Sequence, residues 1–436
     1  MTGRKTAAIV GWLTAVLAAS CGGETSCGEA CPCTTVSDCP GEDEPCRFRA
    51  CRAGVCAIDF APAGADCATG ECNGAGSCVA PFAWTPIAES GAPSPRSAHG
   101  AVWSGARMII WGGHDAAGPL GDGAAYDPAA DDWAPIASTG APSPRFGHTA
   151  VFTGDAMIVW GGYGDDAFRN DGAIYEVASD SWRPMTTTGA PIGRNRHTAV
   201  WANGVMIVFG GLNGSAPVDG GASYDPASDS WTPLPSEAAP AARMRHAAVW
   251  TGAEMLVWGG TNTFDWLNGG KHYHRASDSW TKPLASAGAP YIRETFGFVW
   301  TGESMLVWGG WDGGNYLQSG GIYTPSAPET IEPAGTWIAT SEVGAPSGRA
   351  EHASIFSGSE LFVWGGCGGA VCDELRADGG RFTPSASGGA WLPLPASGAL
   401  SARREHSAVY TGSEVIVWGG RGAGTARFGD GARGAL

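Results

Sequence analysis

The sequence predicts an all-β protein in which a small disulfide-rich module precedes a seven-bladed β-propeller. The first observation is a motif of one aromatic residue and two glycines, which starts at Trp111, Trp160, Phe209, Trp258, Trp308, Trp364 and Trp418. The second is a tryptophan series with the same spacing: Trp84, Trp133, Trp182, Trp231, Trp280, Trp337 and Trp391. The third is a cluster of ten cysteines between Cys27 and Cys78. Repeats of about 50 residues indicate units that are too small to bury their own apolar faces and must stack on neighbours.

Each repeat is predicted to contain four short antiparallel strands. Residues 99–103 and 108–111 are rich in β-branched and aromatic side chains, and Ser104 and Gly105 between them predict a hairpin. A variable loop follows the diglycine, then a third strand near Tyr126, a turn at residues 127–128 and a fourth strand that opens at Trp133. Four such strands are typical of a propeller blade. The diglycine is expected to let the backbone approach a neighbouring aromatic ring, because glycine has no Cβ.

The repeat resembles the kelch repeat. Its pattern is Arg-x-x-His-x-Ala-Val, then Gly-Gly, then Tyr-Asp-Pro, then Trp, and the resemblance covers roughly residues 84–432. It implies a kelch β-propeller, in a family that includes protein-binding adaptors, sugar-binding modules and a few enzymes. The resemblance therefore implies the fold and leaves the activity open.

The order of the strands predicts how the ring closes. A tryptophan strand at Trp84 precedes the first repeat, whereas the last repeat runs to Leu436 without one. The Trp84 strand should therefore complete the last blade and leave no open edge. A tyrosine marks the third strand in five repeats and Phe382 marks it in the sixth, but the seventh offers only residues 429–433, without an aromatic side chain. Either that third strand is weak, or the chain is truncated there.

Residues 1–20 are predicted to be a signal peptide. Arg4 and Lys5 precede an apolar run of about 13 residues, which is shorter than the roughly 20 needed to span a bilayer. Residues 17–21 resemble a bacterial lipoprotein box, although Leu17 stands one position further from Cys21 than is usual. The resemblance implies lipidation of Cys21 and an outer-membrane or cell-surface lipoprotein. Ordinary cleavage after Ser20, which would give a secreted protein, is the alternative.

Cysteine parity favours the lipid anchor. The chain has 13 cysteines, and an odd number in an exported protein leaves one without a partner. If Cys21 carries lipid, the other twelve can form five bridges in residues 21–80 and a sixth between Cys367 and Cys372. The bridges would replace an apolar core in the first segment, and zinc is less favoured there because no histidine precedes His99. The connectivity within that segment cannot be deduced.

These observations divide the chain into three parts. Residues 1–20 form the signal peptide, residues 21–80 form a cysteine-rich, lipid-tethered module, and residues 81–436 form the propeller. A formal net charge of −16 and a pI near 4.9 argue against a nucleic-acid partner, because phosphates favour a basic surface. No transmembrane helix is predicted beyond the signal, and the chain is expected to be a monomer.

One face of the propeller is expected to carry the sequence diversity. The loop after each diglycine and the connection from a fourth strand to the next first strand open on the same face. An arginine enters each first strand at that face: Arg96, Arg145, Arg194, Arg243, Arg293, Arg349 and Arg403. The arginines either form a positive ring that attracts carboxylates or sulfates, or bridge blades by bonding carbonyls or loop carboxylates such as Asp122 and Asp171. The second interpretation is favoured, because repeated positions usually serve packing.

Six histidines recur three residues after those arginines: His99, His148, His197, His246, His352 and His406. A ring of imidazoles suggests metal, but a metal needs three or four ligands that converge within about 2 Å. A structural role is therefore favoured. No catalytic residue, metal or cofactor is predicted.

The candidate binding site lies where the repeat breaks down, in the fourth and fifth blades. Exposed aromatic side chains in loops suggest a surface that a partner covers, and indole rings with carboxylates also suit sugars. The alternative is that the tryptophans pack on the rim. The predicted binding residues are Phe264, Asp265, Trp266, Trp311, Asp312 and Tyr316, with Arg243 and Arg293.

Two classes of function compete at this stage. The favoured one is a non-catalytic binding module for a glycan or an envelope or extracellular protein, attached to the membrane only through its lipid. The alternative is a carbohydrate-active enzyme of the sugar epimerase or oxidase type, and a structural surface protein without a ligand is a third possibility. The carboxylates and histidines that an enzyme would use are Asp265, His272, His274, Glu294 and Asp312.

Overall fold

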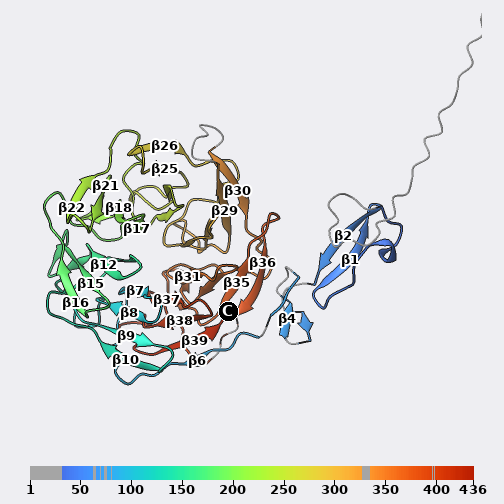
Figure 1. Cartoon of the computed structure of the whole chain (residues 1–436), viewed down its shortest axis with the longest axis horizontal. Coiled ribbons are helices and arrows are strands. Elements are labelled where there is room, and N and C mark those ends of the chain that lie inside the picture. The colour runs from blue at the N-terminus through green and yellow to red at the C-terminus, as the bar shows by residue number, and fades with distance from the viewer. Residues whose placement is uncertain are drawn as a thin grey trace, which may run out of the picture.

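The computed structural model describes residues 32–61, 65–68, 70–72, 76–79, 81–326, 334–394, 396 and 398–436. From residue 81 onward the chain forms a ring of seven four-stranded antiparallel sheets, which confirms the predicted fold class (Figure 1). The first strand of each blade lies toward the centre of the ring and the fourth lies outside. The signal peptide and Cys21 lie outside the described residues, so they stay predictions.

Every blade repeats the same strand order. The first strands are β7 (Gly100–Trp103), β11 (Thr149–Phe152), β17 (Thr198–Ala202), β23 (Ala247–Trp250), β27 (Gly297–Trp300), β31 (Ala353–Phe356) and β37 (Ser407–Tyr410). The second strands are β8 (Met108–Trp111), β12 (Ala156–Trp160), β18 (Val205–Phe209), β24 (Glu254–Trp258), β28 (Met305–Trp308), β32 (Leu361–Trp364) and β38 (Glu414–Trp418). The third strands are β9 (Gly123–Asp127), β15 (Gly172–Glu176), β21 (Gly221–Asp225), β25 (Gly270–His274), β29 (Gly320–Pro325), β35 (Gly379–Thr383) and β39 (Gly431–Ala435). The fourth strands are β10 (Asp132–Pro135), β16 (Ser181–Pro184), β22 (Ser230–Pro233), β26 (Ser279–Pro283), β30 (Gly335–Ala339), β36 (Ala390–Leu394) and, in blade seven, β6 (Thr85–Pro86).

The second strands form the centre of every blade. Residues Met108–Trp111 are at most 1% exposed, and the equivalent residues of the other blades are also buried. Both faces of such a strand are covered, because each blade packs against a neighbour on either side. This explains why the second strands are continuous apolar runs, whereas a strand with one wet face would alternate.

Three of the variable loops contain short ribbons that the repeat pattern does not predict. They are β13 (Tyr163–Gly164) with β14 (Ala167–Phe168), β19 (Leu212–Asn213) with β20 (Ala216–Pro217), and β33 (Cys367–Gly368) with β34 (Glu374–Leu375). Each ribbon lies between the second and third strands of its blade.

Blade seven is built from both ends of the chain. Strand β6 pairs with β39 through Arg433 opposite Thr85 and Ala432 opposite Pro86, which closes the ring. The expectation that the third strand would be weak is wrong, since β39 pairs with β38 over its five residues. Gly434 occupies the place of the missing tyrosine, and a Cβ on it would lie 2.4 Å from the ring of Phe82. The side chain of Phe82, which comes before the first strand of the propeller in the sequence, therefore fills this space.

The diglycine receives an imidazole from the next blade. A Cβ on Gly112 would lie 2.7 Å from the His148 ring, and that ring lies edge-on to Trp111 with centroids 5.3 Å apart. Five other blade interfaces repeat this aromatic contact with a histidine. At the interface of blades four and five, Phe296 takes the place of the histidine on Trp258. The first glycine is therefore required by the close approach of a ring, as the sequence predicts, and the second is crowded by the carbonyl of Ser97 and the Cβ of His99.

A second contact joins neighbouring blades at the outer edge. The indole of Trp182 in blade two donates to the carbonyl of Ala137 at 2.7 Å, and Asp180 accepts from the main-chain nitrogen of the same residue at 2.8 Å. Tyr175 donates to Asp180 at 2.7 Å and so fixes the carboxylate. Blades one and three repeat the arrangement. The tryptophan series of the sequence thus holds the connection from the preceding blade.

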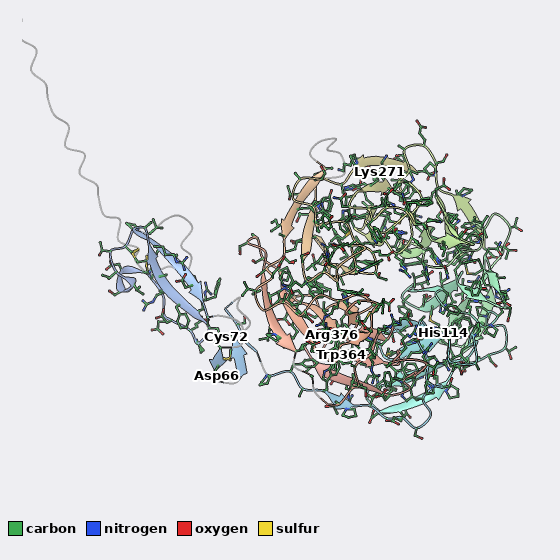
Figure 2. All side chains as sticks on the ribbon, turned by 180° about the vertical axis from the view of Figure 1, so that it is seen from behind. Asp66, Cys72, His114, Lys271, Trp364 and Arg376 are labelled. Atoms are coloured by element: carbon green, nitrogen blue, oxygen red, sulfur yellow. A yellow bond between two sulfur atoms is a disulfide. The ribbon has the colours of Figure 1, made fainter. Side chains whose placement is uncertain are left out.

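The N-terminal module relies on disulfides. It contains the 3-10 turn η1 (Val36–Asp38), the hairpin of β1 (Arg47–Arg52) and β2 (Val55–Phe60), and a sheet of β3 (Asp66–Cys67), β4 (Gly70–Cys72) and β5 (Cys78–Val79). Asp66 and Cys72 mark this second sheet in Figure 2, outside the ring. Four bridges are described: Cys33–Cys51, Cys39–Cys56, Cys46–Cys72 and Cys67–Cys78. Cys27 and Cys31 lie outside the described residues.

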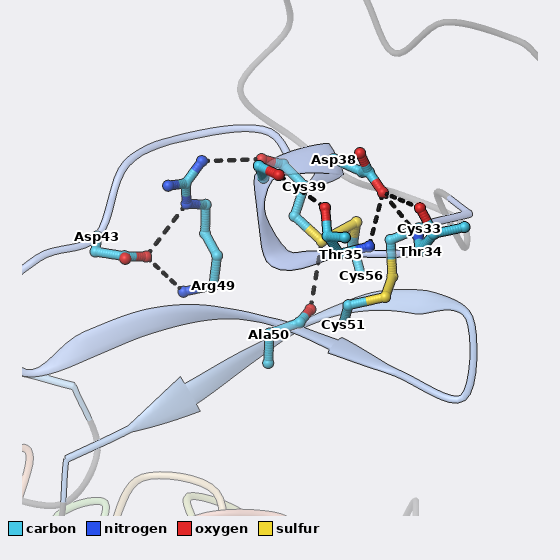
Figure 3. Close-up of a disulfide and its surroundings, with 11 residues drawn as sticks. Cys33, Thr34, Thr35, Asp38, Cys39, Asp43, Arg49, Ala50, Cys51 and Cys56 are labelled. Carbon is cyan, nitrogen blue, oxygen red and sulfur yellow. Dashed lines mark hydrogen bonds and ion pairs between the residues drawn. A yellow bond between two sulfur atoms is a disulfide. The ribbon is translucent and has the colours of Figure 1, made fainter.

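Polar contacts support the bridges at the tip of the hairpin (Figure 3). Asp38 accepts hydrogen bonds from the main-chain nitrogens of Thr34 and Thr35, at 2.7 and 2.8 Å. Arg49 contacts Asp43 at 3.2 Å and the carbonyl of Cys39 at 3.1 Å. The apolar cluster of the module consists of Cys46, Ala61 and Cys72 with three partly buried neighbours, so the bridges replace a core.

The buried histidines predict a specific loss of stability in mild acid. Burial, and then the charge of Arg145, lower the pKa of His148 to about 3. The unfolded chain takes up a proton near pH 6.5, so this contribution to stability is complete above pH 6.5 and is lost as the pH falls toward 3. Burial likewise lowers the pKa of His197, His352 and His406 to about 3.

His148→Phe should make the fold less sensitive to acid, because phenylalanine occupies the same place in blade five. Below pH 6.5 the variant should lose less unfolding free energy than the wild type, by about 1.4 kcal/mol per pH unit. Urea unfolding at pH 7.5 and 5.5 measures this difference. If the variant and the wild type have the same pH dependence, His148 has the same pKa in the folded and the unfolded chain.

Candidate functional site

The variable-loop face is defined here as the loops between second and third strands together with the connections from each fourth strand to the next first strand. Within the described part of the propeller, every large apolar side chain that is exposed lies in one of these segments: Ile192, Phe264, Tyr291, Val343 and Val371. Phe264, in the loop of blade four, is 87% exposed. The turns on the opposite face contain no such side chain among the described residues. This asymmetry marks the variable-loop face as the candidate interface.

A buried arginine anchors the loops of each blade. In blade one, Nε of Arg96 donates to the carbonyl of Ser94 at 2.8 Å, and Nη1 donates to the carbonyls of Gly112 at 3.1 Å and Asp122 at 3.0 Å. These partners lie before the first strand, after the second strand and before the third strand. All seven arginines repeat the three contacts and are at most 5% exposed.

The arginines therefore support the structural interpretation, with one correction. Their side chains bond within a blade, whereas the sequence suggested bridges between blades. The link between blades comes from the main chain instead: the nitrogen of Gly113 in blade one donates to the carbonyl of Arg145 in blade two at 2.9 Å. Arg243 and Arg293, two of the predicted binding residues, are 5% and 0% exposed and are held in the same way.

The inner ends of the connections form a rim around the central axis. In every blade the residue just before the histidine, or before Phe296, has a left-handed backbone with φ between 52° and 63°: Ala98, Gly147, Arg196, Arg245, Thr295, Glu351 and Glu405. Several of these residues bond to each other from blade to blade, as in Glu405 N to Glu351 O at 3.2 Å and Ala98 N to Glu405 O at 3.2 Å. The first strands that follow are neighbours around the axis. The side chains at these positions therefore come together although they are about 50 residues apart.

Five charged residues of this rim are unevenly distributed among the blades. Blades three and four supply Arg196 and Arg245, while blades five, six and seven supply Glu294, Glu351 and Glu405. Arg245 bonds Glu294 at 2.9 Å across the interface of blades four and five, and the Glu294 side chain is 6% exposed. Burial lowers the pKa of Arg196, and the charge of Arg245 adds to this, while the three glutamates oppose it. These five charged residues around the axis are called the rim cluster below.

The loop of blade six approaches the same cluster. Cys367 and Cys372 are joined by a disulfide, and the Cys372 sulfur lies 2.9 Å from a guanidinium nitrogen of Arg404. Arg404 also contacts Glu351 at 2.6 Å. Burial and the neighbouring Glu405 raise the pKa of Glu351. The bridge thus places the long loop of blade six beside the rim cluster.

The predicted aromatic patch is only partly available to a ligand. Trp266 and Trp311 meet edge to face with centroids 5.3 Å apart, and a Cβ on Gly313 would lie 2.6 Å from the Trp266 ring. Trp266 therefore packs on the loop of blade five. Phe264 and Asp265 are exposed on the loop of blade four, and Trp311 and Tyr316 are half-buried.

Asp312 serves its own loop. It accepts hydrogen bonds from the main-chain nitrogens of Gly314 at 2.9 Å and Asn315 at 2.6 Å. Partial burial opposes the shift, but these hydrogen bonds lower the pKa of Asp312. The binding role of the whole set, Phe264 through Tyr316, stays a prediction.

The residues that an enzyme would need have separate partners. His272 is fully buried and bonds Glu254 and Tyr323, both at 2.9 Å. His274 bonds Ser277 at 2.8 Å in the turn on the opposite face. Glu294 pairs with Arg245, and Asp265 and Asp312 belong to exposed loops. His272 therefore links Glu254 of its own blade to Tyr323 of blade five through buried polar contacts.

Sequence reasoning included Glu294 but missed the rest of the rim cluster. Arg196, Arg245, Glu351 and Glu405 occupy one position of the repeat, so aligning the seven repeats would have shown charged residues in four blades and small or polar ones in three. Such an alignment would not show the left-handed backbone that turns this position toward the axis.

A family model described as the KLHDC2/KLHL20/DRC7 Kelch-repeats domain matches residues 79–238 and 223–420. A search of curated proteins found no match to the chain.

The pair in the rim cluster can be tested by a double-mutant cycle. Arg245→Met should lower the free energy of unfolding by about 1–3 kcal/mol, because it leaves the carboxylate of Glu294 buried without a partner. The double variant Arg245→Met with Glu294→Met should recover most of this loss, since no buried charge remains. Urea unfolding of the wild type, both single variants and the double variant gives the coupling. Strictly additive effects would contradict a direct pair.

Proposed function

The chain belongs to the kelch-repeat family, since the family model matches most of it. We propose that the protein is an exported, lipid-anchored binding module that holds a protein partner on its variable-loop face. Kelch propellers are typically protein-binding modules. The observation that carries the proposal is the gathering of every exposed large apolar side chain of the described propeller in the loops of that face. Such side chains are costly in water unless a partner covers them.

The rim cluster supports recognition at the centre of the same face. Its arginines lie in blades three and four and its glutamates in blades five to seven, where Arg404 also pairs with Glu351, so the centre of the face presents charges of both signs. Charges of both signs at fixed positions favour one orientation of a charged partner over others. Apolar loops around a polar centre therefore provide contact area, and the cluster provides specificity.

A protein partner is favoured over a glycan. Binding of sugar rings would need open indole faces, but Trp266 covers Gly313 and meets Trp311 edge to face. The exposed side chains are instead scattered over blades three to six and include Ile192, Val343 and Val371. Dispersed aliphatic and aromatic contacts suit a protein surface better than a sugar ring.

Export and anchoring are supported by the cysteines. Five disulfides lie within the described residues, which indicates an oxidising compartment. Among the described residues no helix is long and apolar enough to cross a bilayer. Attachment through a lipid on Cys21 agrees with the odd number of cysteines and with the signal at residues 1–20.

A photo-crosslinking amino acid placed at Phe264 should capture the partner in intact cells, because this side chain is 87% exposed on the proposed interface. The same amino acid at Glu303, in an exposed turn of the opposite face, provides the matched control. Adducts are read by immunoblotting against a tag and identified by mass spectrometry. The expected result is a discrete protein adduct from position 264 alone.

The comparison of positions 264 and 303 tests which face of the propeller binds the partner. Equal adducts from positions 264 and 303 would contradict an interface on the variable loops. A glycan adduct at position 264, recognised by its mass and by glycosidase treatment, would replace the protein partner with a sugar.

The anchor gives a separate prediction. Mass spectrometry of the mature protein should find an N-terminal Cys21 that carries diacylglycerol, and Cys21→Ser should release the protein from the membrane fraction. A mature chain that begins at an unmodified Cys21 would contradict the lipoprotein assignment and leave a secreted protein.

A further inference from the structure

We propose that the guanidinium of Arg243 in blade four is a preformed subsite for a carboxylate of the protein partner, in the place that an aspartate of the chain fills in four other blades. The inference rests on the proposed function, because it names the chemical group that the variable-loop face binds. It is carried by a comparison of the seven equivalent arginines.

Four of the arginines have a carboxylate of their own. The pairs are Arg96 with Asp122 at 3.0 Å, Arg145 with Asp171 at 2.9 Å, Arg349 with Asp378 at 3.1 Å and Arg403 with Asp430 at 2.8 Å. Each aspartate directly precedes the third strand of its blade. Blades three, four and five have Gly220, Gly269 and Ser319 at this position.

The carboxylate position is open to solvent. The arginine side chains of the four pairs are 0% exposed, whereas their aspartate side chains are between 31% and 59% exposed. The bound carboxylate therefore lies at the surface and the guanidinium below it. A carboxylate from another molecule can reach the same place without movement of the blade.

Blade four leaves this place empty of side chains. A Cβ on Gly269 would meet no heavy atom within 4 Å. Nε and Nη1 of Arg243 are used by the carbonyls of Ala241, Gly259 and Gly269. Its Nη2 has no hydrogen-bond partner among the described residues and is not completely enclosed by protein atoms. In the four paired blades the equivalent nitrogen bonds the aspartate, so in Arg243 this donor of a side chain that is 95% buried lacks the carboxylate that the other blades supply.

The electrostatics distinguish Arg243 from its neighbours. Burial lowers the pKa of Arg243 to about 10, and no neighbouring charge offsets it. At neutral pH the group is still charged, so a positive charge lies in a poorly solvated place without a counterion. Asp219 acts on Arg194, and Asp312 together with the Ser319 hydroxyl acts on Arg293. Gly220 leaves a similar opening at Arg194, but of these three arginines Arg243 is the one on which no acidic group acts among the described residues.

The four paired blades identify the chemistry of the ligand group. They show that this cradle accepts a carboxylate, whose two oxygens match the planar donors of a guanidinium. In a protein partner this group is the side chain of an aspartate or glutamate. Phe264 is an exposed apolar side chain on the loop that ends at Gly269.

The test compares Gly269→Asp with Gly269→Asn in the full chain. The two side chains have the same shape, but only aspartate can supply the missing carboxylate. The probe is the peptide acetyl-Gly-Glu-Gly-amide, with acetyl-Gly-Gln-Gly-amide and glucuronate at the same ionic strength, measured by calorimetry. The wild type should bind the glutamate peptide at least about tenfold more tightly than the glutamine peptide, as expected for one charge-assisted pair. Gly269→Asp should lose this preference and should have a higher Tm than Gly269→Asn.

Three results would overturn the subsite. They are equal binding of the two peptides by the wild type, unchanged binding of the glutamate peptide by Gly269→Asp, and binding of glucuronate without binding of the peptide. The crosslink from position 264 keeps the two proposals apart. If it forms in the wild type while the peptide result is negative, the proposed function stands and the Arg243 subsite is rejected.

Discussion

The variable-loop face depends on a guanidinium that is buried beneath it in every blade. A charge removed from water is unfavourable by several kcal/mol unless hydrogen bonds satisfy it. Here the cost is offset by carbonyls that have left the strand ladder, at the end of one strand and the start of another. Nε and Nη1 of this guanidinium therefore satisfy otherwise unpaired backbone carbonyls and fix both ends of a loop. The sequence of the loop between them can vary, because the arginine bonds main-chain carbonyls, which every residue has.

The blade interfaces follow from a different constraint, which is the lack of room at the diglycine. The ring of a histidine, or of Phe296, fills the space that a Cβ on the first glycine would occupy, and the second glycine lies against the backbone of its own blade. At the outer edge, tryptophan and aspartate bond the carbonyl and the nitrogen of one residue from the preceding blade. Both contacts join a blade to its neighbour, so no blade is complete without the next one.

The fold was predictable because the period, the diglycine and the tryptophans each recur in phase. Ring closure was also predictable, since a fourth strand stands alone before the first repeat. The strength of β39 was not, because the aromatic ring of blade seven comes from Phe82, which is more than 340 residues away in sequence. The aromatic loops were found, but their packing was not, since a loop has no period from which contacts can be derived. The rim cluster and the unpaired Arg243 depend on a backbone conformation and on the absence of an aspartate, which become visible only when the blades are superposed.

The seam in blade seven gives the chain a mechanical weak point. The N-terminal module enters the propeller through Phe82, Trp84 and β6, and β6 is joined to β39 over two residue pairs. The other fourth strands are joined to their third strands over at least three pairs. A pull on the N-terminal module is therefore transmitted to the shortest ladder in the ring. Tension there would peel β6 away before any other blade is disturbed, so the direction in which force is applied decides whether the ring stays closed.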